Sequence, residues 1–279
     1  MNRINRVLAI SAIALSTSLV GCGSSTSLTT EGVFVVGMEC AYAPFNWTEP
    51  TKSDSNVAIE HVNDAYAEGY DVQVAALIAK ELNLTLKIKA IAWEGLIPAL
   101  NSGEIDAIIA GMSPTEARKQ TIDFTDSYYT STHVILLKSD SSFASATTLG
   151  DFSGARVIGQ TGTLYADLVP QLVAKGAIAG TNLDTVPEIV GAISQGTVDV
   201  TILEEPVAKG IVSQFGDEFT YIKPTDGFEV NEEDVVVSIG VRKNFDYTKR
   251  INNVLNNVLI KSKRDSLMQQ AIALATSGE

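Results

Sequence analysis

The chain has 279 residues, 45% of them hydrophobic, which is enough for one large or two smaller domains with a real core. Its formal net charge of −13 argues against nucleic acid as a partner, although an acidic surface is also a common route to solubility and says little about a ligand. With two histidines, two cysteines and no paired metal-ligand spacing, the sequence predicts no metal, no cofactor and no disulfide framework.

The first 21 residues have the pattern of an export signal. Arg3 and Arg6 form a basic start, and the apolar run from Val7 to Val20 is too short to span a bilayer as a mature helix. Removal of this segment, which holds two arginines and no acidic residue, would change the formal charge to −15. The sequence therefore predicts an extracytoplasmic protein.

The end of this signal, Leu19-Val20-Gly21-Cys22, resembles the bacterial lipobox, in which the cysteine becomes the acylated first residue of the mature protein. Residues 22–30 are small and polar, which is typical of a flexible tether. A Cys22 with two or more acyl chains, such as palmitate, would anchor the protein to the cell membrane without a transmembrane helix. The alternative is an ordinary secretory cleavage beside an incidental cysteine.

Strands and helices alternate after the tether. The expected elements are a strand over 31–38, a loop over 39–45, an exposed insertion over 48–68, an amphipathic helix with Asp71 as its N-cap, an alternating strand over 84–90, a short helix over 93–100 and a buried strand over 105–110. Such alternation indicates an α/β fold. Cys40, in the first loop, has no base near it in sequence and is expected to be a buried small residue.

An arginine follows the buried strand and stands beside a predicted helix start. Ser113 has the place of an N-cap, Pro114 of the first helical residue, and Glu116 completes a capping box. Such a start leaves amide donors pointing outward at the carboxyl end of a strand, where open α/β sheets bind ligands. Arg118 and these amides would form an anion site. The alternative is a capped surface helix carrying a solvated arginine.

A short internal sequence repeat predicts two similar lobes. Residues 101–107 and 194–200 share a helix end, a glycine, a β-branched residue and an aspartate, and each copy leads into a hydrophobic strand. Aligning the two glycines sets Gly111 opposite Glu204 at two strand ends. A chance resemblance of so short a pattern is the alternative.

The second half continues the alternation of strands and helices. It predicts a strand over 156–159, a tight loop over 160–163, a helix over 164–175, a strand ending at Glu204-Glu205-Pro206, a strand over 235–241 and mostly helix over 245–276. The helix start at Thr163 offers a second site for an anion.

These residues together describe a ligand with both charges. Arg118 suits a carboxylate because its planar guanidinium can donate two parallel hydrogen bonds. Glu204 would pair with an ammonium group, and the rings of Tyr42 and Trp93 would pack over the methylene groups of the ligand. A zwitterionic amino acid fits this set.

Six motifs that cover nearly all of the mature chain then carry a family resemblance. They are V-G-M-E-C-A-Y-A-P-F, G-Y-D-V-Q-V-A, W-E-G-L-I-P-A-L-N-S-G-E-I-D-A-I-I-A-G-M-S, R-K-Q-T-I-D-F-T-D-S-Y-Y, Q-T-G-T and E-E-P-V-A. Each is weak alone, but in this order and spacing they resemble the extracytoplasmic solute-binding proteins of the polar amino-acid family, the receptors of ABC importers. The resemblance implies that an ABC permease in the membrane receives the ligand.

The resemblance also implies a two-lobed periplasmic-binding-protein fold of type II, with two α/β lobes that close on the ligand by a hinge motion. Lobe 1 is expected over 31–128 and 233–279, and lobe 2 over 132–228. Two crossover segments, near 128–132 and 229–234, would join them. The protein is expected to be a monomer and not an enzyme.

Ligand contacts are carried over residue by residue. Arg118 corresponds to the clamp on the ligand carboxylate, with Thr163 assisting; the Gly111 carbonyl, Ser113 and Glu204 correspond to the holders of the amino group. The full predicted set is Glu39, Tyr42, Trp93, Gly111, Met112, Ser113, Arg118, Gln160, Thr163 and Glu204. The family usually has Asp where this chain has Glu204, and Glu205 is adjacent, so which of the two acids holds the amino group stays open.

Several of these residues could instead have purely structural roles. Tyr42 and Trp93 could be ordinary core aromatics, Ser113 only a cap, and Gln160 a surface residue. Asp123 and Asp126, in contrast, are expected to be structural rather than to contact the ligand.

Side-chain specificity rests on Glu39, which follows the first strand and precedes Tyr42 by three residues. An acid and two rings could hold a cationic tip, so the preferred ligand is predicted to be Lys, Arg or His. Two other functions stay open on the same fold. One is a periplasmic dehydratase-like enzyme, against which stands the lack of a nucleophile–base pair; the other is a ligand sensor that passes its state to a signalling partner.

Overall fold

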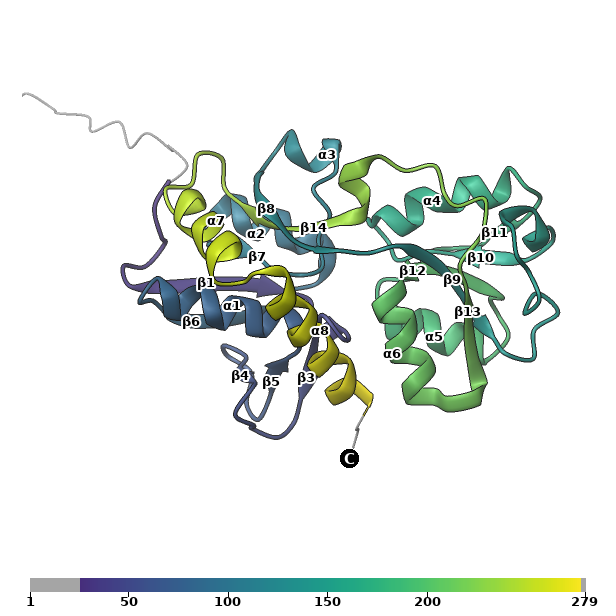
Figure 1. Cartoon of the computed structure of the whole chain (residues 1–279), viewed down its shortest axis with the longest axis horizontal. Helices are drawn as coiled ribbons and strands as arrows, with labels where there is room; N and C mark the ends of the chain where they lie inside the picture. Colours follow the sequence, from purple (N-terminus) through teal and green to yellow (C-terminus); the bar gives the residue numbers. More distant parts are fainter. Residues whose placement is uncertain (1–25, 277–279) are drawn as a thin grey trace, which may run out of the picture.

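Two lobes, each built on its own five-stranded sheet, make up the computed structural model, which describes residues 26–276 (Figure 1). The predicted signal over 1–21 and the proposed lipidation site Cys22 lie outside the described residues. Within residues 26–276, no helix is both long enough and apolar enough to cross a membrane.

The sheet of the first lobe has the order β6-β1-β7-β14-β8. Its strands are β1 (Val33–Met38), β6 (Thr85–Ala90), β7 (Ala107–Ile108), β8 (Asp123–Thr130) and β14 (Val236–Val241). The accompanying helices are α1 (Tyr70–Glu81), the 3₁₀ turn η1 (Trp93–Gly95), α2 (Leu96–Ser102), α3 (Glu116–Lys119), α7 (Thr248–Asn257) and α8 (Lys261–Thr276). The chain thus leaves this lobe after β8 and returns to it with β14.

The sheet of the second lobe has the order β11-β10-β12-β9-β13. Its strands are β9 (His133–Lys138), β10 (Arg156–Ile158), β11 (Ile178–Ala179), β12 (Val200–Glu204) and β13 (Phe219–Ile222). The helices are α4 (Leu164–Val173), α5 (Val186–Ser194) and α6 (Glu205–Phe215), with 3₁₀ turns η2 (Leu149–Phe152) and η3 (Gly216–Glu218). A further 3₁₀ turn, η4 (Glu232–Val235), lies in the segment that returns to the first lobe and contacts β14. The chain passes between the two sheets at residues 131–132 and again between residues 223 and 235.

The two sheets share the same pattern of strand directions, which agrees with the predicted pair of similar lobes. In each sheet the first three strands in order are parallel and the last two are antiparallel to their neighbours. The strand after each copy of the repeat, β7 or β12, is the third in its sheet. Gly103 and Gly196 have φ angles of +79° and +71°, so the glycine of each copy lets the chain turn out of a helix.

Three local predictions were wrong in detail. Residues 48–68 are not a plain insertion, because β2 (Ala41–Tyr42), β3 (Asn46–Glu49), β4 (Val57–Ala58) and β5 (Tyr66–Glu68) form a small sheet of their own. Asp71 is not an N-cap: Gly69 precedes α1, and Asp71 is the second helical residue and fully buried. The strand predicted over 105–110 pairs only at Ala107 and Ile108, although the whole segment is buried.

The described part of the predicted tether, residues 26–30, is held against the first lobe. The side chains of Thr26 and Ser27 donate to Asp246, and the amide of Thr29 donates to Asp106 at 2.8 Å. Arg242 donates to the Ser27 carbonyl and forms a buried ion pair with Asp106. The prediction of a flexible tether over 22–30 is therefore wrong for residues 26–30.

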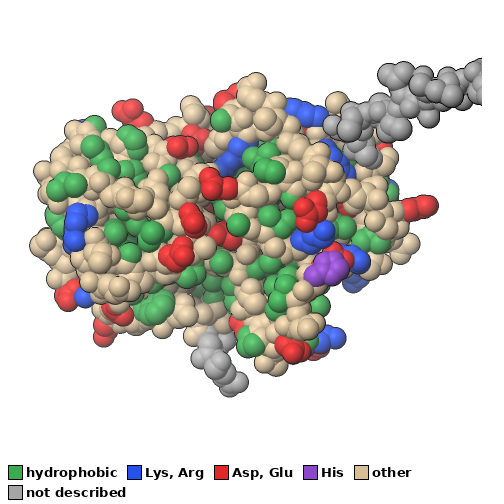
Figure 2. Space-filling view, turned by 180° about the vertical axis from the view of Figure 1, so that it is seen from behind, with side chains coloured by type: hydrophobic (Ala, Val, Ile, Leu, Met, Phe, Trp, Pro, Cys, Tyr) green, Lys and Arg blue, Asp and Glu red, His purple; other side chains and the backbone are tan. Residues whose placement is uncertain are grey.

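A single hydrophobic cluster crosses from one lobe to the other. It joins the core of the first lobe to buried side chains of α5 and α6, such as Val190 and Ile211. Helix α6 also packs along α8, which belongs to the first lobe (Figure 1). The lobes are therefore in contact, as in a closed form. Acidic side chains are scattered over both lobes on the face in Figure 2, in keeping with the net charge of −13.

Candidate functional site

A cavity between the lobes brings together eight of the ten predicted ligand contacts. The first lobe contributes Glu39, Tyr42, Trp93, Gly111, Ser113 and Arg118, and the second contributes Gln160 and Thr163. Leu164 and Tyr165, which the sequence analysis did not predict as ligand contacts, complete the lining. Both lie in the first turn of α4, directly after Thr163, so the predicted helix start was the signal that could have indicated them.

Arg118 is the cation of this cavity. Its guanidinium donates to the Ser113 carbonyl at 2.8 Å and lies 5.1 Å from the Trp93 ring centroid. Burial lowers the pKa of Arg118 from its ordinary value, yet among the described residues no carboxylate forms an ion pair with it. The arginine is thus held in place by neutral partners, which leaves its charge for another group.

Helix α3, which carries Arg118, does not begin where the sequence predicts. Its N-cap is Thr115, whose hydroxyl accepts from the Arg118 amide, and Ser113 instead donates to the Asp234 carbonyl at 3.3 Å. The helix has only four residues, and Thr115 accepts from the amide of Arg118. The predicted N-cap at Ser113 and helix start at Pro114 are therefore wrong. The guanidinium is the positively charged group at this end of the cavity.

Two hydrogen-bonded bridges join the lobes at the cavity. Gln160, which is buried, donates from Nε2 to both carboxylate oxygens of Glu39 at 2.9 and 3.1 Å. The indole Nε1 of Trp93 donates to the Gly162 carbonyl at 2.9 Å, and Arg118 reaches the same carbonyl at 3.5 Å. Gln160 is therefore not a surface residue, and Trp93 is not an ordinary core aromatic.

Burial raises the pKa of two neighbouring groups, Glu39 and Cys40, but only Glu39 lines the cavity. Burial raises the pKa of Glu39 above its ordinary value, while the hydrogen bond from Gln160 opposes that shift. Burial also raises the pKa of the Cys40 thiol to about 12, which makes the thiol unreactive, as its sequence surroundings predict. Glu39 is thus the acidic group of the cavity.

Glu204 and Met112 do not line this cavity. Met112 is a core side chain, and its carbonyl accepts from the Ser238 amide at 3.0 Å. Glu204 ends β12 and is 3% exposed, and burial raises its pKa to about 8. Its Oε2 and the hydroxyl of Tyr42 are buried atoms without a hydrogen-bond partner among the described residues.

Other polar side chains of the set are already paired. Glu205 forms an ion pair with Lys209 at 2.6 Å and accepts from Thr132, so its carboxylate is occupied. The hydroxyl of Thr163 donates to the Gln160 carbonyl at 2.7 Å and caps α4. Asp123 pairs with Lys243 and Asp126 accepts from Asn256, which confirms that both are structural.

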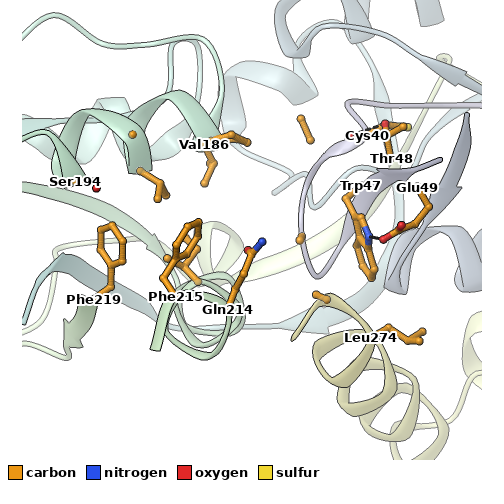
Figure 3. A pocket seen from close by; sticks show the side chains of 17 residues that line it. Cys40, Trp47, Thr48, Glu49, Val186, Ser194, Gln214, Phe215, Phe219 and Leu274 are labelled. Atoms are coloured by element: carbon orange, nitrogen blue, oxygen red, sulfur yellow. Dashed lines mark hydrogen bonds between the residues drawn. The ribbon is translucent and has the colours of Figure 1, made fainter. Parts of the chain in front are cut away.

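A larger cavity of about 640 Å³ lies elsewhere between the lobes (Figure 3). Its lining is mostly apolar and comes from the small sheet and from α5, α6 and α8, as Trp47, Val186, Phe215 and Leu274 illustrate. The described residues around it include no Lys or Arg, and Glu49 there accepts from the Trp47 indole at 2.6 Å. This cavity therefore lacks the charges that an amino acid requires.

Comparison with known proteins identifies the family. Residues 34–272 match the family described as bacterial extracellular solute-binding proteins, family 3. The chain belongs to this family. Among curated proteins, it is 27% identical over 254 residues to the arginine-binding extracellular protein ArtP of Bacillus subtilis, covering 90% of this chain and 91% of that protein.

Two further relatives support the same assignment. A probable histidine-binding protein of Campylobacter jejuni is 31% identical over 195 residues, which cover 70% of this chain and 68% of that protein. The solved structure of the substrate-binding protein AbpA from Streptococcus pneumoniae, bound to L-arginine, has a TM-score of 0.74 at 22% identity. It covers 89% of this chain and 97% of that one, and shows the shared two-lobed fold.

No metal centre is indicated between residues 26 and 276. No group of three or more His, Cys, Asp or Glu side chains is placed there to hold an ion. His133, the histidine nearest to the cavity, packs against Tyr165 and Phe228, and burial lowers its pKa. The cavity offers binding groups of both charges instead.

Proposed function

We propose that this protein binds an L-amino acid with a positively charged side chain between its two lobes and delivers it to an ABC permease. The observation that carries the proposal is the guanidinium of Arg118, which faces an interlobe cavity without a carboxylate partner among the described residues. A ligand carboxylate would supply that partner through two charge-assisted hydrogen bonds. An acyl anchor at Cys22 and a monomeric state belong to the same proposal.

The ammonium end of the ligand is assigned to Glu204 and Tyr42. A buried carboxylate without a partner is costly unless it takes up a proton or a cation. Glu204 has such a carboxylate, with its pKa raised to about 8, and Tyr42 has a free buried hydroxyl. Glu205 is occupied by Lys209, which favours Glu204 as the holder of the amino group. Ligand entry with a small movement of Glu204 would satisfy both groups.

Glu39 is assigned as the partner of the ligand's positively charged side chain. Its carboxylate is held by Gln160, which can donate to an anion but brings no charge to balance it. A guanidinium, ammonium or imidazolium would balance that charge beside the rings of Tyr42 and Trp93. Relatives named for binding arginine and histidine agree with this assignment.

Calorimetric titration with each of the twenty amino acids tests the proposal. Tight binding of arginine, lysine or histidine, with weak or no binding of glutamine and glutamate, is expected. Preference for glutamine or glutamate would overturn the side-chain assignment, and absence of binding by any amino acid would overturn the whole proposal. The two open alternatives are tested in parallel: turnover of prephenate or arogenate would indicate an enzyme, and a ligand-dependent complex with a signalling protein would indicate a sensor.

A further inference from the structure

A buried carboxylate outside the cavity, Asp71, lies at the centre of a hydrogen-bond network that reaches two of the cavity's backbone turns. Asp71 is 0% exposed and is the second residue of α1. Its Oδ1 accepts from the Tyr128 hydroxyl at 2.7 Å, and its Oδ2 accepts from the Asn46 amide at 2.8 Å. Among the described residues no cation pairs with it, so hydrogen bonds and the helix N-terminus alone stabilise its charge.

Each arm of the network ends on a backbone amide at the cavity. Through Tyr128, the first arm reaches the amide of Gly111, which donates to the Tyr128 hydroxyl at 3.3 Å. The second arm passes through Asn46, whose Oδ1 accepts from the Cys40 amide at 2.7 Å. Gly111 lines the cavity, and Cys40 directly follows Glu39, which lines it too.

Both of these amides belong to residues with left-handed backbone conformations. Gly111 has a φ of +62°, which glycine adopts freely, but Cys40 has a φ of +58° and carries a side chain. A non-glycine residue in this region costs of order 1–2 kcal/mol, so the surrounding contacts must hold it there. The Asn46 amide oxygen holds the amide of the Cys40 turn, and the Thr48 hydroxyl donates to its carbonyl at 3.0 Å.

We infer that Asp71 is a positioning residue of the ligand site, because its carboxylate fixes the two left-handed turns at Cys40 and Gly111 that place Glu39 and Tyr42 around the ligand. Tyr42 packs against Gly111, where an added Cβ would lie 3.1 Å from the Tyr42 ring. The inference rests on the proposed amino-acid binding, but it concerns a residue that touches no ligand. It explains why a charged group is buried without a cation beside this cavity.

Asp71→Asn tests the inference. The substitution keeps the shape of the side chain but leaves one acceptor oxygen where Asp71 has two, so either the Tyr128 hydroxyl or the Asn46 amide loses its acceptor. We expect the dissociation constant for L-arginine to rise about tenfold or more, since hydrogen bonds to a charged group contribute about 1.5–3 kcal/mol each. The amide resonances of Cys40 and Gly111 in the ¹⁵N-labelled protein should also shift, with or without ligand.

A double variant that exchanges the Asn and Asp side chains between positions 46 and 71 should restore ligand affinity. In Asn46→Asp/Asp71→Asn, the Cys40 amide still has an acceptor at position 46, the new amide at 71 donates to position 46, and the Tyr128 hydroxyl still has an acceptor. Affinity should return to within about threefold of wild type, and both amide resonances should return toward their wild-type positions. A merely stabilising role for Asp71 would not produce this reciprocal rescue.

Asp106→Asn is the matched control. Asp106 is equally buried in the first lobe, but its partners Thr29, Val35 and Arg242 do not line the cavity. This variant should lose thermal stability and keep its affinity within about twofold. If Asp71→Asn does not fold, Tyr128→Phe tests the Gly111 arm alone. Wild-type affinity and unshifted resonances in Asp71→Asn would overturn the inference, whereas a wild-type protein that binds no amino acid would overturn the proposed function instead.

Discussion

Trp93 of the first lobe donates its indole Nε1 to the carbonyl of Gly162 in the second, at a distance of 2.9 Å. The hydrogen bond closes the lobes over the cavity from the side of Arg118, which reaches the same carbonyl at 3.5 Å and lies over the Trp93 ring. One side chain thus covers the ligand cavity, supports its arginine and joins the lobes.

Trp93→Phe should open the protein without removing the aromatic wall. The ring stays, but the donor to Gly162 is lost, which removes a net stabilisation of about 1 kcal/mol from the closed form. Ligand affinity should fall about fivefold, and small-angle X-ray scattering of the ligand-free variant should give a larger radius of gyration than wild type. An unchanged radius and affinity would contradict a role of this bond in closure.

Arg118→Ala should abolish amino-acid binding, with affinity reduced at least 100-fold, because two charge-assisted hydrogen bonds of about 1.5–3 kcal/mol each are lost. Calorimetry measures the loss, and circular dichroism should show an intact fold. Lys119→Ala is the control, since Lys119 is the adjacent cation but pairs with Glu116 and Glu233 outside the cavity. High-affinity binding by the Arg118 variant would refute its assignment to the carboxylate.

Glu39→Gln should change specificity rather than abolish binding. The substitution removes the negative charge that faces a cationic side chain and leaves the carboxylate and ammonium contacts of the ligand in place. Affinity for L-arginine should fall about tenfold or more, while affinity for L-glutamine stays within about threefold. Equal losses for both ligands in competition titrations would show that Glu39 serves the cavity's shape instead.

Glu204→Gln should make the ligand-free protein less sensitive to alkaline pH. Because burial raises the pKa of Glu204 from 4.5 to about 8, the folded protein holds a proton that the unfolded chain releases above pH 4.5. The contribution of this group to stability is therefore present below about pH 4.5 and is lost as the pH rises through about 8.

Thermal melts at pH 5 and pH 9 check this sign. Between these two values, the melting temperature of wild type should fall further than that of Glu204→Gln. The other acids whose pKa burial raises, Glu39 and Asp71, are present in both proteins and cancel in the comparison. Equal falls would mean that Glu204 is not buried as a free acid in the ligand-free state.

Asp246→Ala should release the N-terminal segment from the first lobe. Asp246 accepts from the side chains of Thr26 and Ser27, and its amide donates to the Thr26 carbonyl at 2.7 Å, so the substitution removes two of these attachments. Limited proteolysis followed by mass spectrometry should show faster cleavage near residues 26–30, with ligand affinity unchanged. Equal cleavage rates would indicate that Arg242, Asp106 and the backbone amide of residue 246 are enough to fix the segment.

The family resemblance indicated eight of the residues that line the cavity. Local patterns in the sequence determined the α/β architecture, the repeat at Gly103 and Gly196 and the cap at Thr163. Each of these depends on a few consecutive residues: a left-handed glycine ends a helix, and a hydroxyl before a helix caps it. Such preferences act within one turn of chain, so a single sequence reveals them.

Only the tertiary structure decided the roles of Ser113, Asp71 and Glu204. Thr115 caps α3 in place of Ser113 because Asp234, 121 residues away, takes the Ser113 hydroxyl. Asp71 is buried against Tyr128 and Asn46, which come from other elements, and Glu204, at the end of β12, is buried by the folded chain around it. A carboxylate's partners and its exposure to water depend on segments far apart in the chain, and folding alone brings those together.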